Sequence, residues 1–450
     1  MKPEKIHVIG GGLVGALTTI YLAQRGFHVV LLERRPDMRR VDISAGRSIN
    51  LAVTARGLKA LGEVGLLEAV MDIAIAMKGR MLHDAEGHTS FVPYGQKESE
   101  VIHSVSRGDL NKLLLDKAAS YDNVEIFFQQ RCLGYDPESS TLTLVDETTS
   151  QQKTMQASVI IGTDGGGSVL RKMLAEHQPD FAQSEETLAH GYKELLIPTA
   201  NGAFQMEKHA LHIWPRKSYM LIALPNMDGS FTVTFFFAHT GAESFAALKT
   251  QAQVEAFFAA TFPDALALMP TLAADFFANP TGSMTTVKCA PWHLGAKAML
   301  MGDAAHAIVP FFGQGMNCGF EDCSTLGSLL DAQTSPDWEA LFAQLETARK
   351  PNADAIADMA LENFVEMRDT VADAKFQLKK QVGFELERRY PGRFIPRYAM
   401  VVFHPEISYA DARARSITQD GVLDTLCASI DTLEQVDWQK ADQLLQQMGS

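Results

Sequence analysis

A glycine-rich turn near the start of the chain constrains the fold more than any other feature. Gly10, Gly12 and Gly15 fit the pattern Gly-x-Gly-x-x-Gly, with Leu13 and Val14 between the last two. A β-branched run at residues 6–9 precedes the turn, and a helical pattern at 16–25 follows it. The first glycine permits a tight turn, the second lets the backbone approach a pyrophosphate, and the third lets helix and strand pack closely. The turn therefore predicts a nucleotide-binding βαβ unit.

An acidic residue supports this interpretation. A second apolar strand, residues 27–32, ends in Glu33, where a carboxylate can accept hydrogen bonds from ribose hydroxyls. The N–H groups at the start of the helix would face the phosphates. A purely structural glycine turn is the alternative, and the fingerprint alone does not separate FAD from NAD.

The whole-chain composition excludes several classes of protein. A formal net charge of -14 argues against binding to nucleic acid or to an anionic membrane. The 5 cysteines form neither a disulfide framework nor a metal-binding pair, which favours a reducing, cytoplasmic compartment. Lys2 and Lys5 ahead of an apolar run imitate a signal peptide, but the glycines fit a buried strand, turn and helix better. No apolar run reaches about 18 residues, so neither a membrane span nor a membrane anchor is expected.

The chain divides into three regions. Apolar strands at 124–128, 157–162 and 299–301 extend the nucleotide-binding domain, while strand-like runs at 192–197, 210–214, 219–224 and 230–237 predict an antiparallel sheet. From residue 338 onward the pattern is helical. The expected domains are a discontinuous FAD-binding domain (1–75, 97–180 and 281–330), a substrate-binding β-sheet domain (76–96 and 181–280) and a C-terminal helical region (331–450) that closes the active site.

Two further glycine turns carry an aspartate directly after a predicted strand. Asp164 lies in the first, at residues 161–171, and Asp303 in the second, at 300–306. Each aspartate can bond sugar hydroxyls at the edge of an open α/β sheet. Gly315, Met316 and Asn317 then open a helix whose start can face the pyrimidine side of a flavin. Either turn alone can be an ordinary strand-to-helix connection, but the three together favour FAD.

This set of three motifs, in this order, resembles the aromatic-ring hydroxylase family of FAD-dependent monooxygenases. The resemblance implies an α/β fold: a Rossmann-like FAD-binding domain of the p-hydroxybenzoate hydroxylase type, an interleaved antiparallel β-sheet substrate domain and a C-terminal helical region. Arg107, before a predicted helix, matches the family's arginine that reaches the cofactor, although an exposed helix-start arginine is the alternative. Cys132 lies where the adenosine is contacted through backbone. The other expected FAD contacts are Arg34, Arg35 and Ala52.

Several segments resemble the family of kynurenine 3-monooxygenases more narrowly, namely residues 47–52, 78–81, 93–95, 190–195, 309–317, 359–367 and 393–398. This resemblance implies that Arg80, Tyr94, Asn363 and Tyr398 bind the amino-acid end of L-kynurenine. The chemistry agrees, because a carboxylate favours a guanidinium partner with phenol and amide groups completing the hydrogen bonds. Without the resemblance, Arg80 would be read as a surface arginine and Tyr94 as an anchor in a turn.

The same resemblance supplies an apolar wall for the aromatic ring. Strand alternation places Thr232, Thr234 and Phe236 on one face. The residues implied to contact the substrate, besides the four above, are Met220, Ile222, Leu224, Phe236, Ile102, Pro310, Phe311 and Glu366. For the apolar members, plain core packing is the partly compatible alternative.

The implied reaction is that NADPH reduces FAD, O2 adds to give a flavin C4a-hydroperoxide, and one oxygen is transferred to ring carbon 3 of L-kynurenine. The ring's amino group activates that position, so no protein base is assigned. NADPH would bind transiently, with Arg171 as a candidate contact, and His306 is expected to be a packing or hydrogen-bonding residue. Phe312 stands where some bacterial relatives carry histidine. The alternatives are a flavin hydroxylase of another aromatic acid and a flavoprotein whose redox state controls a protein partner.

Overall fold

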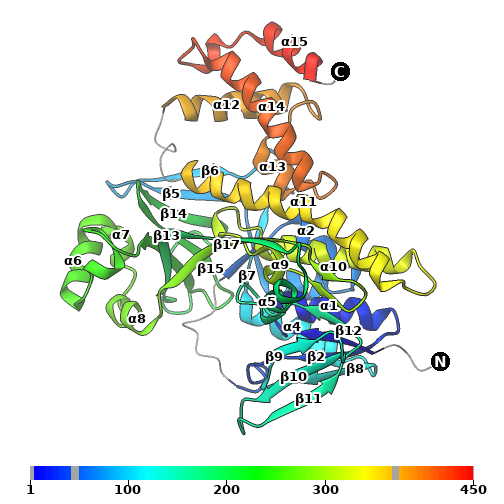
Figure 1. Ribbon diagram of the computed structural model, residues 1–450. Helices are drawn as coiled ribbons and strands as arrows, with labels where there is room; N and C mark the ends of the chain where they lie inside the picture. Colours follow the sequence, from blue (N-terminus) through cyan, green and yellow to red (C-terminus); the bar gives the residue numbers. More distant parts are fainter. Residues whose placement is uncertain (1–4, 42–49, 367–373, 449–450) are drawn as a thin grey trace.

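The computed structural model describes residues 5–41, 50–366 and 374–448 and contains two large sheets and a set of C-terminal helices (Figure 1). The first sheet has six strands in the order β18-β19-β12-β1-β2-β8. Its strands are β1 (Lys5–Ile9), β2 (His28–Leu32), β8 (Val124–Phe127), β12 (Val159–Gly162), β18 (His293–Leu294) and β19 (Ala298–Leu300). All neighbours except β18 and β19 pair in parallel. The strands predicted for the nucleotide-binding domain therefore lie in one sheet.

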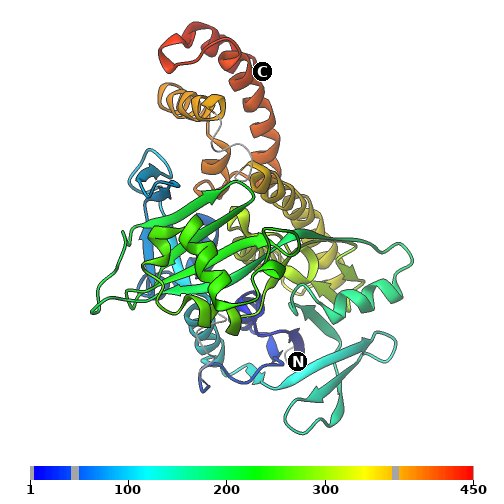
Figure 2. The same cartoon turned by 90° about the vertical axis from the view of Figure 1, so that its left-hand side faces the viewer.

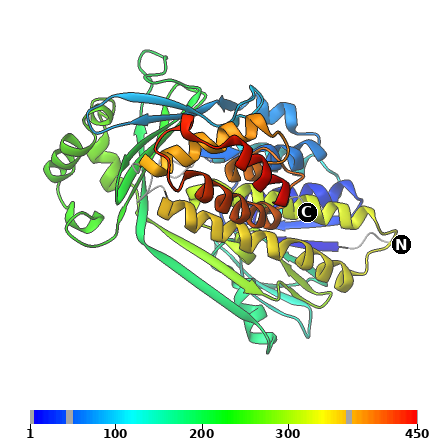
Figure 3. The same cartoon turned by 90° about the horizontal axis from the view of Figure 1, so that it is seen from above.

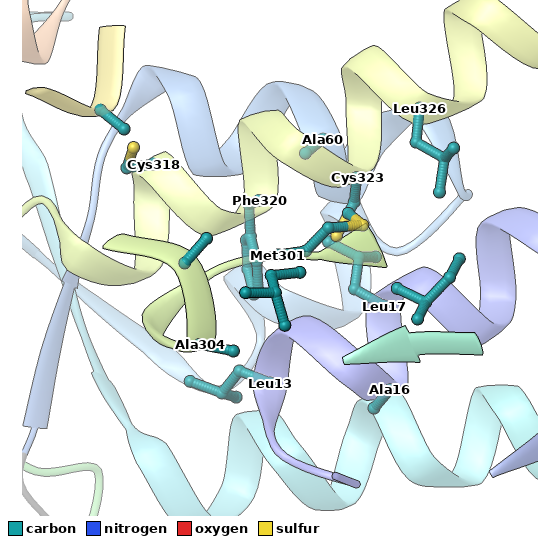
Figure 4. Close-up of a cluster of buried hydrophobic side chains, with 14 of the residues drawn as sticks. Leu13, Ala16, Leu17, Ala60, Met301, Ala304, Cys318, Phe320, Cys323 and Leu326 are labelled. Carbon is teal, nitrogen blue, oxygen red and sulfur yellow. The ribbon is translucent and has the colours of Figure 1, made fainter. Parts of the chain in front are cut away.

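Helix α1 (Leu13–Gln24) connects β1 to β2 and is buried along nearly its whole length because α4 (Arg107–Ala119) and α10 (Gly315–Asp331) pack against it. Figure 4 shows the apolar contact between α1 and α10, which also involves α2 (Ala55–Glu63) and the end of β19. The contributing side chains include Leu13, Ala16, Leu17, Ala60, Met301, Phe320, Cys323 and Leu326. This packing fixes the glycine turn at the carboxyl end of β1, which lies between β12 and β2 in the sheet.

The second sheet has seven strands in the order β17-β13-β16-β15-β14-β5-β6. They are β5 (Gly79–His83), β6 (Thr89–Pro93), β13 (Ala182–Ile197), β14 (Ala210–Arg216), β15 (Tyr219–Pro225), β16 (Phe231–Ala238) and β17 (Gly282–Ala290). All pairs are antiparallel except β14 with β5. The predicted antiparallel sheet is therefore present, and it is wider than the four strand-like runs indicated.

The two faces of this sheet belong to different cores. Phe231, Val233, Phe235 and Phe237 of β16 pack in one cluster with residues of α6 (Gln251–Thr261), α7 (Pro263–Leu266) and α8 (Leu272–Ala278). Phe236 instead joins the core of the FAD-binding region. Because side chains alternate along a strand, this division puts the even-numbered residues of β15 and β16 toward the expected substrate chamber.

Smaller elements complete the body of the molecule. One three-stranded sheet consists of β9 (Gln130–Asp136), β10 (Thr141–Asp146) and β11 (Gln152–Gln156), and the other of β3 (Asn50–Val53), β4 (Ala74–Met77) and β7 (Ile102–Ser106). Further helices are α3 (Leu67–Met71), α5 (Val169–His177), α9 (Asp303–His306) and the short 3-10 turns η2 (Phe245–Ala247) and η3 (Pro310–Phe312). The sequence pattern did not predict the sheet of β9 to β11.

The strand pairing corrects one predicted boundary. We expected residues 281–330 to belong to the FAD-binding domain, but β17 pairs with β13 along the edge of the seven-stranded sheet. The chain returns to the six-stranded sheet only at β18. By strand pairing, the β-sheet domain thus extends to Ala290.

The C-terminal region is helical and consists of α11 (Trp338–Val365), α12 (Ala374–Arg389), α13 (Arg397–Val402), α14 (Tyr409–Cys427) and α15 (Trp438–Met448). Figure 2 shows α12, α14 and α15 standing away from the body, and Figure 3 shows them above the junction of the two sheet regions. They form a small core of their own, which includes Leu378, Val382, Leu386 and Leu426. None of the described helices is long and apolar enough to cross a bilayer.

Candidate cofactor and substrate site

The glycine fingerprint has the geometry that its spacing predicts. Gly10 has a φ of 102°, and its N–H donates to the Leu32 carbonyl at 2.8 Å. A Cβ atom at Gly15 would lie 1.8 Å from the Gly10 carbonyl oxygen, whereas one at Gly12 would meet nothing within 4 Å. Gly10 and Gly15 are therefore required by the protein itself, while Gly12 borders open space at the start of α1. That space suits a pyrophosphate, and the turn fits FAD in this respect.

Glu33 connects the turn after β1 to the residues after β2. Its Oε2 accepts from the Gly11 N–H at 2.6 Å, and its Oε1 accepts from the Arg35 N–H at 2.8 Å and the Arg35 Nε at 2.7 Å. Burial raises the pKa of Glu33, but the Arg35 contacts outweigh this effect and lower the pKa overall. The carboxylate is therefore charged, and its remaining lone pairs can accept from a ribose. Arg34 is exposed beside it.

Asp164 and Asp303 differ in their surroundings. Asp164 accepts from Ser168 Oγ at 2.6 Å and from the Val169 N–H at 2.7 Å, so it caps the start of α5. Burial raises the pKa of Asp164, and these hydrogen bonds oppose that shift. Asp303 opens α9, is exposed, and has no hydrogen-bond partner in the part of the chain that the structure describes. Asp303 is therefore the better placed of the two to bind a sugar hydroxyl.

The loop before α10 is held by Asn317. Its Nδ2 donates to the Ala52 and Gly313 carbonyls at 2.9 and 3.0 Å, and its Oδ1 accepts from the Thr54 N–H at 3.0 Å. The Asn317 side chain thus joins β3 to the start of α10. Its amide is occupied by these contacts, so Gly315, Met316 and Asn317 would meet a flavin mainly through backbone.

The other residues suggested as cofactor contacts differ in exposure. Arg107 is exposed at the start of α4, whose cap is the Ser106 hydroxyl. Cys132 is buried, and burial raises its pKa to about 12, so its thiol is inert. Arg171 does not suit a transient NADPH contact, because it is 2% exposed and donates to the Ala304 and Gly166 carbonyls and to Glu185. The NADPH contact suggested from the sequence is therefore not proposed.

His306 belongs to a buried ionic pair. Its Nε2 lies 2.7 Å from Asp322 Oδ2, which also accepts from the Gly302 N–H at 3.0 Å. Burial lowers the pKa of His306, but the Asp322 carboxylate outweighs it and raises the pKa well above its ordinary value. The expected hydrogen-bonding role of His306 is confirmed, since the pair holds the turn that carries Asp303.

Three of the four residues expected at the amino-acid end of the substrate meet at one point. The Arg80 guanidinium carbon lies 5.4 Å from the ring centroid of Tyr94 and 4.6 Å from that of Tyr398. The two phenol rings stack, with centroids 5.5 Å apart. Arg80 comes from β5, Tyr94 from the turn after β6, and Tyr398 from α13. The cluster therefore spans the β-sheet domain and the C-terminal region.

This cluster contains one polar group that the described residues leave without a hydrogen bond. The Tyr94 hydroxyl is buried without a hydrogen-bond partner among the described residues, although Arg80 and Tyr398 lie beside it. Arg80 forms no ion pair within the described ranges. A partly buried guanidinium next to an unpaired hydroxyl is suited to a carboxylate ligand.

The fourth residue, Asn363, lies on α11, and its Nδ2 donates to the Phe311 carbonyl at 2.7 Å. Glu366, at the end of the same helix, has its Oε1 3.6 Å from Lys380 Nζ of α12. Asn363 thus faces the loop that carries η3. Of the segments that suggested the family, residues 47–49 and 367 lie outside the described residues.

The expected apolar wall lies on one face of the seven-stranded sheet. Met220 and Phe236 are cross-strand partners, as are Ile222 and Thr234. The Phe236 and Phe311 ring centroids are 5.2 Å apart, and a small cavity bordered by Met220, Phe236 and Phe364 adjoins them. The wall residues Met220, Leu224, Phe236, Ile102 and Phe311 are buried in one core, Ile222 packs against it, and Pro310 is exposed.

The sequence reasoning missed Glu194 on this face. Glu194 pairs in register with Thr234, which pairs in turn with Ile222, so the carboxyl group shares the face of the apolar wall. Its Oε2 is buried without a partner among the described residues. Burial raises the pKa of Glu194 to about 7, and Arg107 opposes the shift. The alternation Tyr192, Glu194, Leu196 in β13 was the available signal.

Comparisons with known proteins agree with this geometry. Residues 4–360 match the model of the FAD binding domain family. The kynurenine 3-monooxygenase of Myxococcus xanthus (strain DK1622) is 51% identical, over 99% of this chain and 95% of that protein, and that of Stenotrophomonas maltophilia (strain K279a) is 44% identical, over 97% and 95%.

A solved structure shows the same fold. The tetrameric form of 2-methyl-3-hydroxypyridine-5-carboxylic acid oxygenase is similar with a TM-score of 0.67 and 20% identity, over 82% of this chain and 94% of that one. The sequence identity to the curated relatives is much higher than to this solved structure. The chain therefore belongs to the kynurenine 3-monooxygenase family of FAD-binding proteins and is an FAD-dependent aromatic hydroxylase.

Proposed function

We propose that this protein hydroxylates L-kynurenine to 3-hydroxy-L-kynurenine, using FAD, NADPH and O2. The observation that carries the proposal is the convergence of Arg80, Tyr94 and Tyr398 beside an apolar wall. L-Kynurenine has two parts that match these surfaces: a zwitterionic amino-acid end for the polar cluster and a flat aromatic ring for the apolar wall. The names of the curated relatives support the same substrate.

The amino-acid end would be held by the polar cluster. The Arg80 guanidinium pairs with the substrate carboxylate, and the Tyr94 hydroxyl, which has no partner among the described residues, donates to the same group. Tyr398 covers Arg80 from α13, and Asn363 of α11 would contribute its amide to the same end of the substrate. Charge-assisted hydrogen bonds in a partly buried site fix the orientation of the molecule as well as its affinity.

The aromatic ring would lie against the wall of Met220, Ile222, Leu224, Phe236 and Phe311. An apolar chamber orients the ring and excludes water from the reaction. The ring's own amino group donates electrons to the carbon beside it, so the protein has no need of a base at that carbon. The chain's contribution is thus binding, orientation and water exclusion.

FAD would be held by the glycine turn at its pyrophosphate, by Glu33 at its ribose and by Asp303 at its ribityl chain. The backbone of Gly315, Met316 and Asn317 would face its ring system, and Arg107 and Ala52 would border it. When bound and reduced by NADPH, FAD would activate O2, and O2 would supply the oxygen atom that is transferred. The buried pair of His306 and Asp322 keeps the Asp303 turn in place.

The test combines two readings on the purified holoenzyme. L-Kynurenine should accelerate NADPH oxidation and yield 3-hydroxy-L-kynurenine, because both ends of this substrate match the chamber. Anthranilate and 4-hydroxybenzoate, which lack the amino-acid end, serve as controls. The second candidate is a flavin hydroxylase of another aromatic acid. It would be supported if either control accelerated NADPH oxidation and was hydroxylated, while L-kynurenine did neither.

A further inference from the structure

A buried arginine outside the substrate cluster holds the segment that carries Tyr398. Arg56 of α2 is 1% exposed. Its Nε donates to the Val401 carbonyl at 2.7 Å, and its Nη2 donates to the carbonyls of Met400, His404 and Ile407 at 3.2, 3.3 and 2.5 Å. All four carbonyls belong to residues 397–409, which we call the Tyr398 arm. One guanidinium thus gathers the arm's backbone around itself.

These contacts satisfy groups that would otherwise be left without partners. The last carbonyls of a helix have no intrahelical donor, and α13 ends at Val402. A cation near that end also meets the negative pole of the helix. The ring of Tyr409, at the start of α14, lies 4.0 Å from the Arg56 guanidinium carbon. The last turn of α13 and the first residue of α14 are therefore held by one side chain.

The same arginine belongs to a chain of charges that reaches the cofactor turn. Arg56 Nη1 lies 2.6 Å from Glu321 Oε1, and Glu321 Oε2 lies 3.0 Å from Arg349 Nη1. Arg349 Nε donates to Asp322 Oδ1 at 2.8 Å. Asp322 in turn accepts from the Gly302 N–H, directly before Asp303. A continuous path of buried and partly buried charges thus joins the Tyr398 arm to the turn expected to bind the ribityl chain.

The Tyr398 arm also contacts the loop before α10 directly. The Tyr409 hydroxyl donates to Gln314 Oε1 at 2.8 Å, and Gln314 is the residue before Gly315 at the start of α10. The Phe312 and Tyr398 rings stack with centroids 5.8 Å apart. The loop that faces the flavin and the Tyr398 arm therefore contact each other at both ends of the arm.

We infer that Arg56 is a positioning residue for substrate binding, which it serves by fixing the Tyr398 arm against Arg80 and the flavin loop. The inference rests on the proposed function, because it assigns Arg56 a role in binding L-kynurenine through Tyr398. Arg56 itself does not touch the substrate cluster. Replacing Arg56 should therefore change the affinity for L-kynurenine mainly when the Tyr398 side chain is present.

The first measurement needs no substrate. Hydrogen–deuterium exchange of the FAD-loaded Arg56→Met variant should be at least about tenfold faster than wild type in peptides of the Tyr398 arm. The matched control is Arg25→Met, which removes another arginine that joins two helices, since Arg25 bonds Asp331 of α10 but no part of the arm. Arm exchange in Arg56→Met that equals that of Arg25→Met would overturn the inference.

The second measurement is a double-mutant cycle on the Kd of L-kynurenine, read from the flavin absorbance of the oxidised holoenzyme. Arg56→Met should raise the Kd by about ten- to a hundredfold, but by less than about threefold when Tyr398 is already alanine. Effects that multiply fully in the double variant would show that Arg56 does not act through Tyr398. That result would also overturn the inference.

Two further variants keep the test decisive if Arg56→Met does not fold. Arg56→Lys keeps the charge but cannot reach all four carbonyls, and Tyr409→Phe removes only the bond to Gln314. Arg56→Lys should show smaller increases in the exchange of the Tyr398 arm and in the Kd of L-kynurenine. Wild-type exchange together with a wild-type Kd in this variant would contradict the role. Failure of wild-type enzyme to bind L-kynurenine would instead refute the proposed function, while the exchange result would still decide whether Arg56 holds the arm.

Discussion

The guanidinium carbon of Arg80 lies 4.6 Å from the ring centroid of Tyr398. Arg80 belongs to a strand of the β-sheet domain, and Tyr398 belongs to a short helix of the C-terminal region. A substrate carboxylate bound here would be in contact with both regions. The cluster can therefore exist only when the C-terminal helices are packed on the body, which ties substrate binding to that packing.

Replacing Arg80 should weaken binding of the substrate carboxylate. We expect Arg80→Met to raise the Kd of L-kynurenine about a hundredfold, equivalent to about 2.7 kcal/mol, because the carboxylate loses its charged partner in a partly buried site. Arg80→Lys should recover only part of this, since an ammonium cannot form a bidentate contact. Titration of the oxidised holoenzyme, followed by flavin absorbance, measures both values. Unchanged affinity in Arg80→Met would remove Arg80 from the site.

Removing the Tyr94 hydroxyl should have a smaller effect. Tyr94→Phe retains the ring that stacks on Tyr398, so the fold should be preserved. We expect the Kd of L-kynurenine to rise by about three- to tenfold, the cost of one hydrogen bond. Because the hydroxyl is buried without a partner among the described residues, the variant should also unfold at the same or a slightly higher temperature without substrate. A clear loss of stability in that state would show that the hydroxyl is already used by the protein.

Two glycines of the fingerprint should respond differently to alanine. Gly15→Ala places a Cβ atom 1.8 Å from a backbone oxygen, so the apoprotein should lose about 2 kcal/mol of stability or more. Gly12→Ala meets no protein atom within 4 Å, so the apoprotein should remain as stable as wild type and lose only FAD affinity. Thermal unfolding of the apoprotein and FAD titration separate the two effects. Equal destabilisation by both variants would contradict the assignment of Gly12 to the pyrophosphate.

Glu194 should make stability depend on pH near neutrality. Burial raises its pKa from 4.5 in the unfolded chain to about 7 in the folded protein, so the folded state binds more protons between these values. The free energy of unfolding contributed by this group therefore falls as pH rises from about 4.5 to about 7, by at most about 3 kcal/mol.

Glu194→Gln should remove this dependence. The difference in melting temperature, variant minus wild type, should become more positive as pH rises from 5 to 8. Glu255→Gln, which changes an exposed glutamate, is the control. A difference between Glu194→Gln and wild type that stays constant across this range would show that Glu194 does not change its protonation there.

Local patterns predicted the glycine turn and the strands of the FAD-binding region well. Gly10, Gly15 and the strands on either side follow from short-range rules, because the turn and the crossover helix are specified within a few dozen neighbouring residues. The alternation in β15 and β16 likewise placed Met220 and Phe236 on the same face. These features depend on backbone geometry that the local sequence determines.

Features that depend on distant pairing were not predicted. The membership of β17 in the second sheet is set by β13, about a hundred residues earlier. In the sheet of β9 to β11, the outer strand β11 is mostly exposed and lacks apolar alternation. Arg56 carries no local signal of its role, since it acquires its partners only when remote segments pack together. The quartet of Arg80, Tyr94, Asn363 and Tyr398 was reached through family resemblance.

The central claim is that the Arg80 cluster binds the amino-acid end of L-kynurenine. The most direct test compares the Kd of L-kynurenine with that of kynuramine, its analogue without the carboxylate, in wild type and in Arg80→Met. Wild type should prefer L-kynurenine by about a hundredfold, and the preference should disappear in the variant because the carboxylate then has no partner. An equal preference in both proteins would contradict the account.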